Sequence, residues 1–209
     1  MALVQSHPRD YTVEQYLEIE RKSEERHEFM DGVIYEMAGE SDEHGEITAN
    51  LVREVSSQLM GTHCRVRTKD TKVQSGAANR PAKKVLFSYP DVLVICGKPQ
   101  FRDDHRDVIN NPAVIIEVLS ESTEAFDRGE KFLRYKEWNP TLTDYILVSQ
   151  KTAFVQHSIR QDDGAWLTYD YRGIAQVVAT KSIKVTLDLT RVYDRVVFPD
   201  EGEPDQPLD

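Results

Sequence analysis

The sequence predicts a chain of the α/β (α+β) class, and three observations support this prediction. Short β-branched apolar runs bounded by turn residues recur along the chain, and each has the length of a strand. Other segments repeat apolar residues every three or four positions, as helices that pack on a sheet do. Two strand-like runs also carry an acidic residue at or beside them, Asp91 and Glu117, which indicates a site built on strands.

The first third of the chain predicts a helix, a hairpin and a second helix. Thr12 and Gln15 form a capping-box pattern, so a short helix is expected to begin there. Residues 27–37 are typical of a hairpin whose turn is the Asp-Gly pair at 31–32. A second helix is expected over residues 42–60, because apolar residues at four-residue spacing form a core-facing stripe: Ile47, Leu51, Val55 and Leu59.

The rest of the chain predicts mainly strands. Pro112 opens the apolar run 113–119, which is short and β-branched and is therefore expected to be a buried strand. The residues after it predict a helix that Asn139-Pro140 ends. Further strands are expected over 64–73, over 85–96 with Pro90 at a start, an edge or a bulge, over 144–148, and in an antiparallel meander over 153–160, 166–172 and 175–178. A loop is expected over 75–84 and a last short helix over 187–193, whereas 97–111 is a charged connector with no clear pattern.

Length and composition describe one soluble domain. Residues 11–198 are expected to form it, with flexible termini at 1–10 and 199–209. No apolar run approaches the roughly 20 residues that span a bilayer, and no signal-peptide pattern is found, so no membrane is expected as a partner. Cys64 and Cys96 belong to no partner motif, which indicates a reducing cytoplasm, and two cysteines alone do not predict a zinc site.

Charge is distributed unevenly along the chain. The formal net charge of −10 disfavours a protein that coats nucleic acid by bulk electrostatics. Between Arg65 and Lys84, however, seven basic residues against the single acid Asp70 give a local charge of +6. Two interpretations stay open, a hairpin with a solvated basic face or a pair of strands and a loop that contacts phosphates. The second makes these residues candidates for nucleic-acid binding: Arg65, Arg67, Lys69, Lys72, Lys83 and Lys84.

Glu117 lies inside the buried run 113–119, with an apolar neighbour on each side. An unpaired carboxylate in such a place would be costly or would take up a proton, so Glu117 requires a cation. The next segment offers one, because Asp127 and Lys131 are four residues apart and share one face of the predicted helix. For Lys131 taken alone, a solvated surface pair with Asp127 is the competing explanation.

Asp91 follows Pro90 and starts a second apolar run, so a second carboxylate is expected at a strand. Carboxylates on neighbouring strands can hold one or two hard divalent cations, since Mg²⁺ prefers oxygen ligands. Such an ion activates water and neutralises charge on a phosphodiester. A nearby ammonium, that of Lys131, can orient the attacking water or stabilise the phosphorane. Asp91, Glu117 and Lys131 together therefore predict phosphodiester hydrolysis.

Several motifs together carry a resemblance to a known family. They are Y-T-V-E-Q-Y-L (11–17), R-H-E-F-M-D-G-V-I-Y-E-M-A (26–38), His44 and Asn50, P-D-V (90–92), I-E-V-L-S (116–120), Ser122-Thr123, D-R-G-E-K (127–131) and Tyr135. With them the chain resembles the PD-(D/E)XK nuclease superfamily and, within it, the Uma-type family of putative restriction endonucleases. The resemblance covers most of the chain, from about Tyr11 to Tyr193.

The resemblance implies a restriction endonuclease-like mixed β-sheet core flanked by helices, with Mg²⁺ or Mn²⁺ as cofactor, DNA as substrate and a homodimer as the assembly. Asp91 and Glu117 would be metal ligands, with the carbonyl of Val118 as a third. The superfamily lysine normally stands where this chain has Leu119, so its role is expected to have moved to Lys131. His44 joins the catalytic candidates through the resemblance, with a capping or packing role as the alternative.

Three functions are compatible with these features. The first is a metal-dependent DNA endonuclease that hydrolyses phosphodiester bonds by metal-activated water, and we favour it. The second is a non-catalytic interaction module on a nuclease fold, suggested by the displaced lysine and the overall acidity. The third is an RNA-directed phosphodiesterase. Fold alone does not decide among them.

Overall fold

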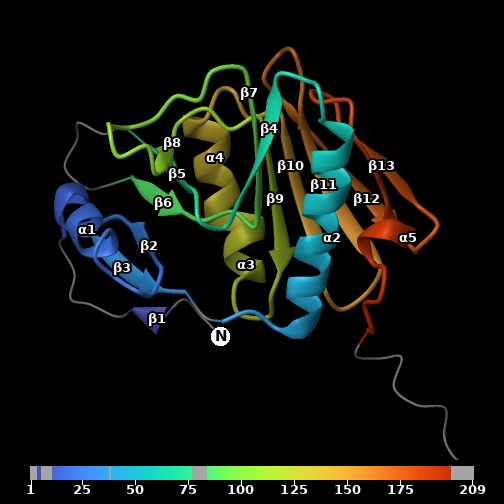
Figure 1. Ribbon diagram of the computed structural model, residues 1–209, viewed down its shortest axis with the longest axis horizontal. Helices are drawn as coiled ribbons and strands as arrows, with labels where there is room; N and C mark the ends of the chain where they lie inside the picture. Colours follow the sequence, from blue (N-terminus) through green and yellow to red (C-terminus); the bar gives the residue numbers. More distant parts are fainter. Residues whose placement is uncertain (1–3, 6–10, 38, 77–83, 199–209) are drawn as a thin grey trace, which may run out of the picture.

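The computed structural model describes residues 4–5, 11–37, 39–76 and 84–198, and it places helices on both faces of a central mixed sheet (Figure 1). This arrangement confirms the predicted fold class. The predicted flexible termini lie outside the described residues, apart from the two residues Val4–Gln5, which form strand β1 and pair with β3. Among the described residues, no helix has both the length and the apolar composition needed to cross a bilayer.

The central sheet has six strands in the order β12-β11-β10-β9-β7-β4. β9 and β10 run parallel, whereas the other neighbours are antiparallel. Every residue of β9 is buried, because strands flank it on both sides and helices cover both faces. The strands are β4 (Cys64–Thr68), β7 (Val92–Cys96), β9 (Val114–Leu119), β10 (Asp144–Ser149), β11 (Phe154–Arg160) and β12 (Trp166–Arg172).

A second sheet, in the order β1-β3-β2-β6-β5-β8, contains the predicted hairpin. Its strands are β2 (His27–Met30), β3 (Val33–Glu36), β5 (Lys72–Ser75), β6 (Leu86–Ser88) and β8 (Val108–Ile109). The strands expected over 64–73 and 85–96 are therefore each two strands that belong to different sheets. Pro90 marks the second break, because it has no N–H for a ladder. The connector 97–111, whose sequence shows no clear pattern, contains β8.

Helix α1 (Val13–Glu20) begins at Thr12, whose side chain and that of Gln15 form the predicted capping box. Helix α2 (Asp42–Gln58) places its predicted stripe against one face of the central sheet. The helix after β9 lies on the opposite face and consists of α3 (Glu124–Phe126), a π-helical turn η1 (Asp127–Lys131) and α4 (Phe132–Trp138). The sequence predicted this helix but not its π turn, a feature that often marks functional sites.

The predicted three-stranded meander is only partly correct. β13 (Val177–Ala179) pairs with β14 (Thr186–Asp188) in a separate two-stranded sheet, and not with β12. The reason is burial, because Val178 and Leu187 pack into the core beneath α2. The last helix, α5 (Leu189–Val192), is shorter than expected because Asp188 still belongs to β14 and accepts the Thr190 N–H at 2.9 Å.

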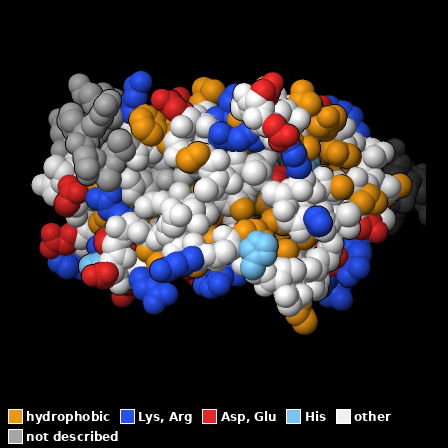
Figure 2. Space-filling view, turned by 90° about the horizontal axis from the view of Figure 1, so that it is seen from above, with side chains coloured by type: hydrophobic (Ala, Val, Ile, Leu, Met, Phe, Trp, Pro, Cys, Tyr) orange, Lys and Arg blue, Asp and Glu red, His pale blue; other side chains and the backbone are white. Residues whose placement is uncertain are grey.

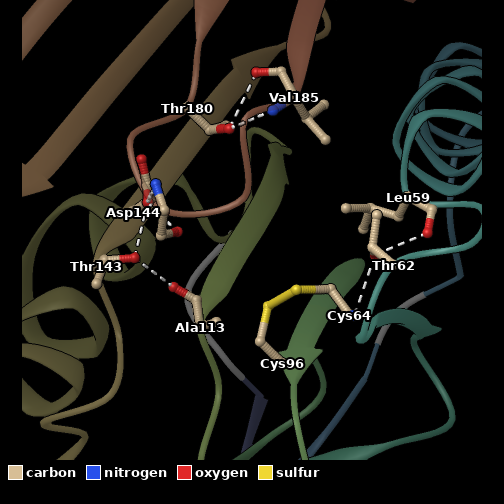
Figure 3. Close-up of a disulfide and its surroundings, with 10 residues drawn as sticks. Leu59, Thr62, Cys64, Cys96, Ala113, Thr143, Asp144, Thr180 and Val185 are labelled. Carbon is tan, nitrogen blue, oxygen red and sulfur yellow. Dashed lines mark hydrogen bonds between the residues drawn. A yellow bond between two sulfur atoms is a disulfide. The ribbon is translucent and has the colours of Figure 1, made fainter.

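Charged side chains are mixed on the surface. Figure 2 shows the molecule from above, a face on which Lys and Arg are interspersed with acidic and apolar side chains and do not gather into one continuous basic patch. Cys64 and Cys96 face each other in the β4–β7 pair and form a disulfide (Figure 3). This differs from the expectation of reduced cysteines, since the two residues are brought together by strand pairing and not by a local motif.

Asp144, at the start of β10, is buried and makes several hydrogen bonds. Figure 3 shows the one that it accepts from the Thr143 hydroxyl. The Asp144 carboxylate is hydrogen-bonded to His157 Nε2 at 2.8 Å and accepts from the Lys181 N–H at 3.0 Å and the Ser182 hydroxyl at 2.7 Å. Burial alone would raise the pKa of Asp144, but these hydrogen bonds outweigh it and lower the pKa to about 2. Asp144 therefore joins β10 to β11 and to the turn before β14.

Replacing Asp144 with Asn is expected to lower the free energy of unfolding at neutral pH by roughly 2–3 kcal/mol. Because the folded pKa is lower than the unfolded one, this stabilisation is present above about pH 4 and disappears as the pH falls towards about 2. Urea denaturation at several pH values measures it, with Asp162→Asn, which removes a fully exposed carboxylate, as the control. Equal stability of Asp144→Asn and wild type at neutral pH would contradict the account.

Candidate active site

A cavity of about 490 Å³ contains the acidic residues that the sequence singled out. Its wall comes from both sheets, from the start of α2 and from η1. Asp91, Glu117, Val118, Lys131 and His44, which are far apart in the sequence, all line it. The structure therefore brings together all the catalytic and metal-binding candidates that the sequence proposed, and their roles stay predictions.

Asp91 directly precedes β7 and follows Pro90, so its side chain projects from the point where the chain passes between the two sheets. Its Oδ2 accepts the backbone N–H of Val118 at 2.8 Å. The same oxygen lies 3.3 Å from His44 Nε2. Asp91 is thus fixed against the residue that follows Glu117, which places the two carboxylates side by side in the wall of the cavity.

The carboxylate of Glu117, on β9, is buried and paired with the Lys131 ammonium. Its Oε1 lies 3.0 Å from Lys131 Nζ but makes no well-directed hydrogen bond. Burial raises the pKa of Glu117 well above its ordinary value, and the nearby charge of Asp127 acts in the same direction. The Oε1 oxygen is ion-paired with Lys131 but lacks a well-directed hydrogen bond, so it keeps a lone pair that a further cation would satisfy.

Lys131 is surrounded by acids. Its Nζ donates to Asp127 Oδ1 at 3.0 Å, and it also lies 3.0 Å from Glu117 Oε1 and 3.6 Å from Glu28 Oε1. Burial alone would lower the pKa of Lys131, but the three carboxylates raise it well above its ordinary value. The ammonium therefore stays protonated. The alternative of a solvated surface pair is wrong, because Lys131 is 5% exposed.

His44 lies in the first turn of α2. The helix is capped by Ser41, whose hydroxyl accepts the His44 N–H at 3.2 Å, so the imidazole itself is not the cap. Its Nδ1 lies 3.4 Å from Glu40 and its Nε2 faces Asp91. Burial would lower the pKa of His44, but the carboxylates of Asp91 and Glu40 outweigh this and raise it. His44 therefore takes up a proton more readily than a free imidazole does, and its ring faces the Asp91 carboxylate.

Glu28 is a site residue that the sequence reasoning missed. It is buried on β2 in the second sheet, and its Oε1 accepts the Tyr89 N–H at 3.3 Å. Burial raises its pKa, against the opposing charge of Lys131. A weaker signal was present in the sequence, because Glu28 is an acid inside a predicted strand, between a histidine and Phe29, whereas Glu117 has an apolar neighbour on each side.

The hairpin that carries Glu28 is tied to the helix that carries Lys131. At its turn, Asp31 has a φ of 52° and Gly32 a φ of 90°, as a type I′ turn requires. The Asp31 carboxylate accepts two hydrogen bonds from Arg134, at 2.8 and 2.7 Å, and Arg134 lies on α4. This bidentate pair holds Glu28 and Lys131 on the same side of the cavity.

The basic candidates separate into different environments. Arg65 and Arg67 are exposed on β4, and Lys84 is exposed as well. Lys69 is half-buried and pairs with Glu40 at the rim of the cavity. The expectation that Lys72 binds nucleic acid is corrected by the structure. Lys72 is buried and lies 3.0 Å from Asp107, so it is not available to a nucleic acid. Lys83 lies outside the described residues.

The donor set fits a hard divalent cation. Carboxylate oxygens of Asp91 and Glu117 and the adjacent carbonyl of Val118 are ligand types that Mg²⁺ and Mn²⁺ prefer. The unsatisfied Oε1 of Glu117 supports this fit on structural grounds. Lys131 adds a fixed positive charge beside these oxygens. The arrangement is therefore suited to binding and polarising a phosphodiester.

Comparison with solved structures finds a protein that shares this fold. A crystal structure described as a putative nuclease belonging to DUF820 from Anabaena variabilis matches with a TM-score of 0.71 over 90% of this chain and 99% of that chain, at 15% sequence identity. At this identity the match shows the fold.

The family model described as Uma2, putative restriction endonuclease, matches residues 13–190, and the chain belongs to this family. Two relatives from Synechocystis sp. are similar in sequence. Uncharacterized protein slr1290 is 35% identical over 88% of this chain and 92% of its own length, and uncharacterized protein sll1609 is 32% identical over 78% and 88%. The resemblance inferred from the sequence motifs is confirmed.

Proposed function

We propose that this protein is a Mg²⁺- or Mn²⁺-dependent endonuclease that hydrolyses phosphodiester bonds of DNA. One observation carries the proposal: Asp91, Glu117 and Lys131, from three separate segments, meet in one cavity. Membership of a restriction endonuclease-like family supports a nucleic acid as the substrate. A buried lysine that is kept charged beside three carboxylates is more than a stable fold needs, because buried ion pairs contribute little to stability.

Asp91, Glu117 and the Val118 carbonyl would hold the cation. When bound, the ion would supply Lewis-acid stabilisation of the phosphate and acidify a water molecule. The Lys131 ammonium would donate to the oxygens on which charge accumulates as the phosphorus–oxygen bond breaks. His44 would keep the Asp91 carboxylate in place through its Nε2, which lies 3.3 Å from Oδ2.

A substrate comparison tests the choice of DNA. Purified protein is incubated with supercoiled plasmid, single-stranded DNA and RNA in the presence of Mg²⁺ or Mn²⁺. Cleavage of DNA in preference to RNA is expected. Preferential RNA cleavage would move the assignment to an RNA-directed phosphodiesterase. Absence of cleavage together with absence of metal binding by calorimetry would favour a non-catalytic interaction module.

Arg65 and Arg67 are expected to contact the DNA backbone, because both are exposed on an edge strand of the sheet that carries Glu117. The Arg65→Ala/Arg67→Ala variant should weaken DNA binding and reduce the slope of log affinity against log salt concentration by about 2. Fluorescence anisotropy at several salt concentrations measures this. Arg195→Ala, which removes another exposed arginine, is the control. An unchanged slope in the double variant would exclude these arginines from the interface.

A homodimer and a cytoplasmic location complete the proposal. β12 is a seven-residue strand at the edge of the central sheet, with Leu167 and Tyr169 nearly half exposed. Such an edge is suited to pairing with a second copy. Light scattering of the wild-type protein should give the mass of a dimer, and light scattering of the Tyr169→Lys variant should give the mass of a monomer. A monomeric wild-type protein would refute the dimer.

A fluorescent fusion of the protein tests the cytoplasmic location when its distribution is compared with the membrane and secreted fractions.

A further inference from the structure

Strand pairing brings Cys64 and Cys96 into contact at one end of the β4–β7 ladder. The two residues are opposite each other in the register, and the Gly97 N–H donates to the His63 carbonyl at 3.0 Å. This bond, one residue outside the cysteines, makes them a non-hydrogen-bonded pair, the kind in which opposed side chains come closest. Their Cα atoms are 4.0 Å apart, and their sulfur atoms are bonded (Figure 3).

Hydrogen bonds hold the turn that leads into Cys64. Gly61, with a φ of 78°, follows the end of α2 and allows the chain to reverse. The Thr62 hydroxyl then donates to the Leu59 carbonyl at 2.8 Å and accepts the Cys64 N–H at 3.1 Å (Figure 3). His63, between these anchored residues, is exposed and its backbone is held on both sides.

His63 is near enough to both cysteines to act with them. One ligand atom from each of His63, Cys64 and Cys96 lies within 4.8 Å of the other two, and within the described ranges no other trio of potential ligand side chains is so close together. One imidazole and two thiolates are typical ligands of Zn²⁺ and other thiophilic cations, whereas Mg²⁺ prefers oxygen. The sequence could not reveal this trio, because the two cysteines are 32 residues apart.

We propose that the reduced protein binds a thiophilic cation of the Zn²⁺ class through His63, Cys64 and Cys96, and that formation of the Cys64–Cys96 disulfide abolishes this site. Opening the disulfide requires two electrons and two protons from a dithiol, which is itself oxidised to a disulfide. Binding of the cation then displaces the two thiol protons, and water completes the coordination. In a reducing cytoplasm the dithiol form would prevail.

The proposed site differs chemically from the carboxylate site and is at the other end of the same strand. Asp91 directly precedes β7, whereas Cys96 is its last residue. The two sets of ligands have no residue in common. A cation at His63, Cys64 and Cys96 would hold the edge strand β4 to β7 in the reduced protein, as the disulfide does in the oxidised form. The proposal does not depend on nuclease activity.

Cobalt binding tests this inference, because Co²⁺ on thiolate ligands gives a near-ultraviolet charge-transfer band that carboxylates do not produce. Reduced full-length protein in oxygen-free buffer should take up one equivalent of Co²⁺ with this band, and Zn²⁺ should bleach it. The oxidised protein should show no band. The reduced Glu117→Gln protein should retain the full band, which separates this site from the carboxylate site.

Two variants assign the ligands. Cys96→Ser keeps only one thiolate and should lose at least about half of the intensity of the charge-transfer band. His63→Ala, which changes an exposed side chain, should weaken Co²⁺ binding by at least about tenfold, the effect of losing one ligand. Circular dichroism checks that each variant is folded. A reduced wild-type protein without the band, or equal Co²⁺ affinity in wild type and His63→Ala, would overturn the proposal.

Discussion

Replacing Lys131 with Met is expected to lower the free energy of unfolding by roughly 3–5 kcal/mol and to abolish cleavage. The ammonium contacts Asp127, Glu117 and Glu28, all of them buried. Methionine matches the length of the lysine stem but leaves these three carboxylates without a cation. A buried charge without its partner costs far more than the intact group contributes, so the loss is large.

Urea denaturation of Lys131→Met and wild type measures the stability change, and plasmid cleavage at a temperature where both are folded measures the activity change. Lys151→Met is the matched control, because Lys151 is exposed in the turn after β10. Lys131→Arg keeps the charge and should recover part of the stability. Wild-type stability in Lys131→Met would show that the carboxylates do not depend on this lysine.

Replacing Glu117 with Gln is expected to separate activity from stability. Cleavage should fall by roughly 10³-fold or more, which corresponds to several kcal/mol of lost metal-assisted stabilisation of the transition state. The metal-free protein should be as stable as wild type or more stable. Glu117 is buried with an unsatisfied oxygen and a raised pKa, and in an acid a raised folded-state pKa means that the ionised form opposes folding above the unfolded pKa.

Calorimetric titration with Mn²⁺ and thermal unfolding measure the two effects of Glu117→Gln. Glu121→Gln, which changes an exposed acid four residues later, should leave both unchanged. If Glu117→Gln is less stable than wild type by more than about 1 kcal/mol, the Glu117–Lys131 pair is a net stabiliser and the carboxylate is not held at a cost. If Mn²⁺ binding is unaffected, Glu117 is not a ligand.

Local sequence patterns were sufficient to predict most helices and strands and part of the candidate active site. The capping box at Thr12, the Asp-Gly turn and the stripe along α2 depend on neighbours in the sequence, so the predictions agree with the structure. Glu117 and Lys131 could be connected because the helix directly follows the strand and a buried acid requires a cation. Their separation of 3.0 Å agrees with that requirement.

Features that depend on distant pairing could not be predicted from local patterns. The runs 64–73 and 85–96 each divide between two sheets, which no periodicity indicates. Lys72 was counted as a surface cation, but its partner Asp107 comes from a segment that had no pattern. Cys64 and Cys96 meet only because β4 and β7 are neighbours. Glu28 lines the cavity because β2, a strand of the second sheet, forms part of the cavity wall.

Metal-dependent cleavage of supercoiled plasmid by wild type and Glu117→Gln tests the central claim most directly. The account predicts nicked and linear products from wild type with Mg²⁺ or Mn²⁺, none with a chelator, and none from Glu117→Gln prepared in parallel. Equal cleavage by the two proteins would show that the activity does not come from the Asp91–Glu117–Lys131 site. Intact plasmid in every reaction of the folded wild type would contradict the assignment of a DNA endonuclease.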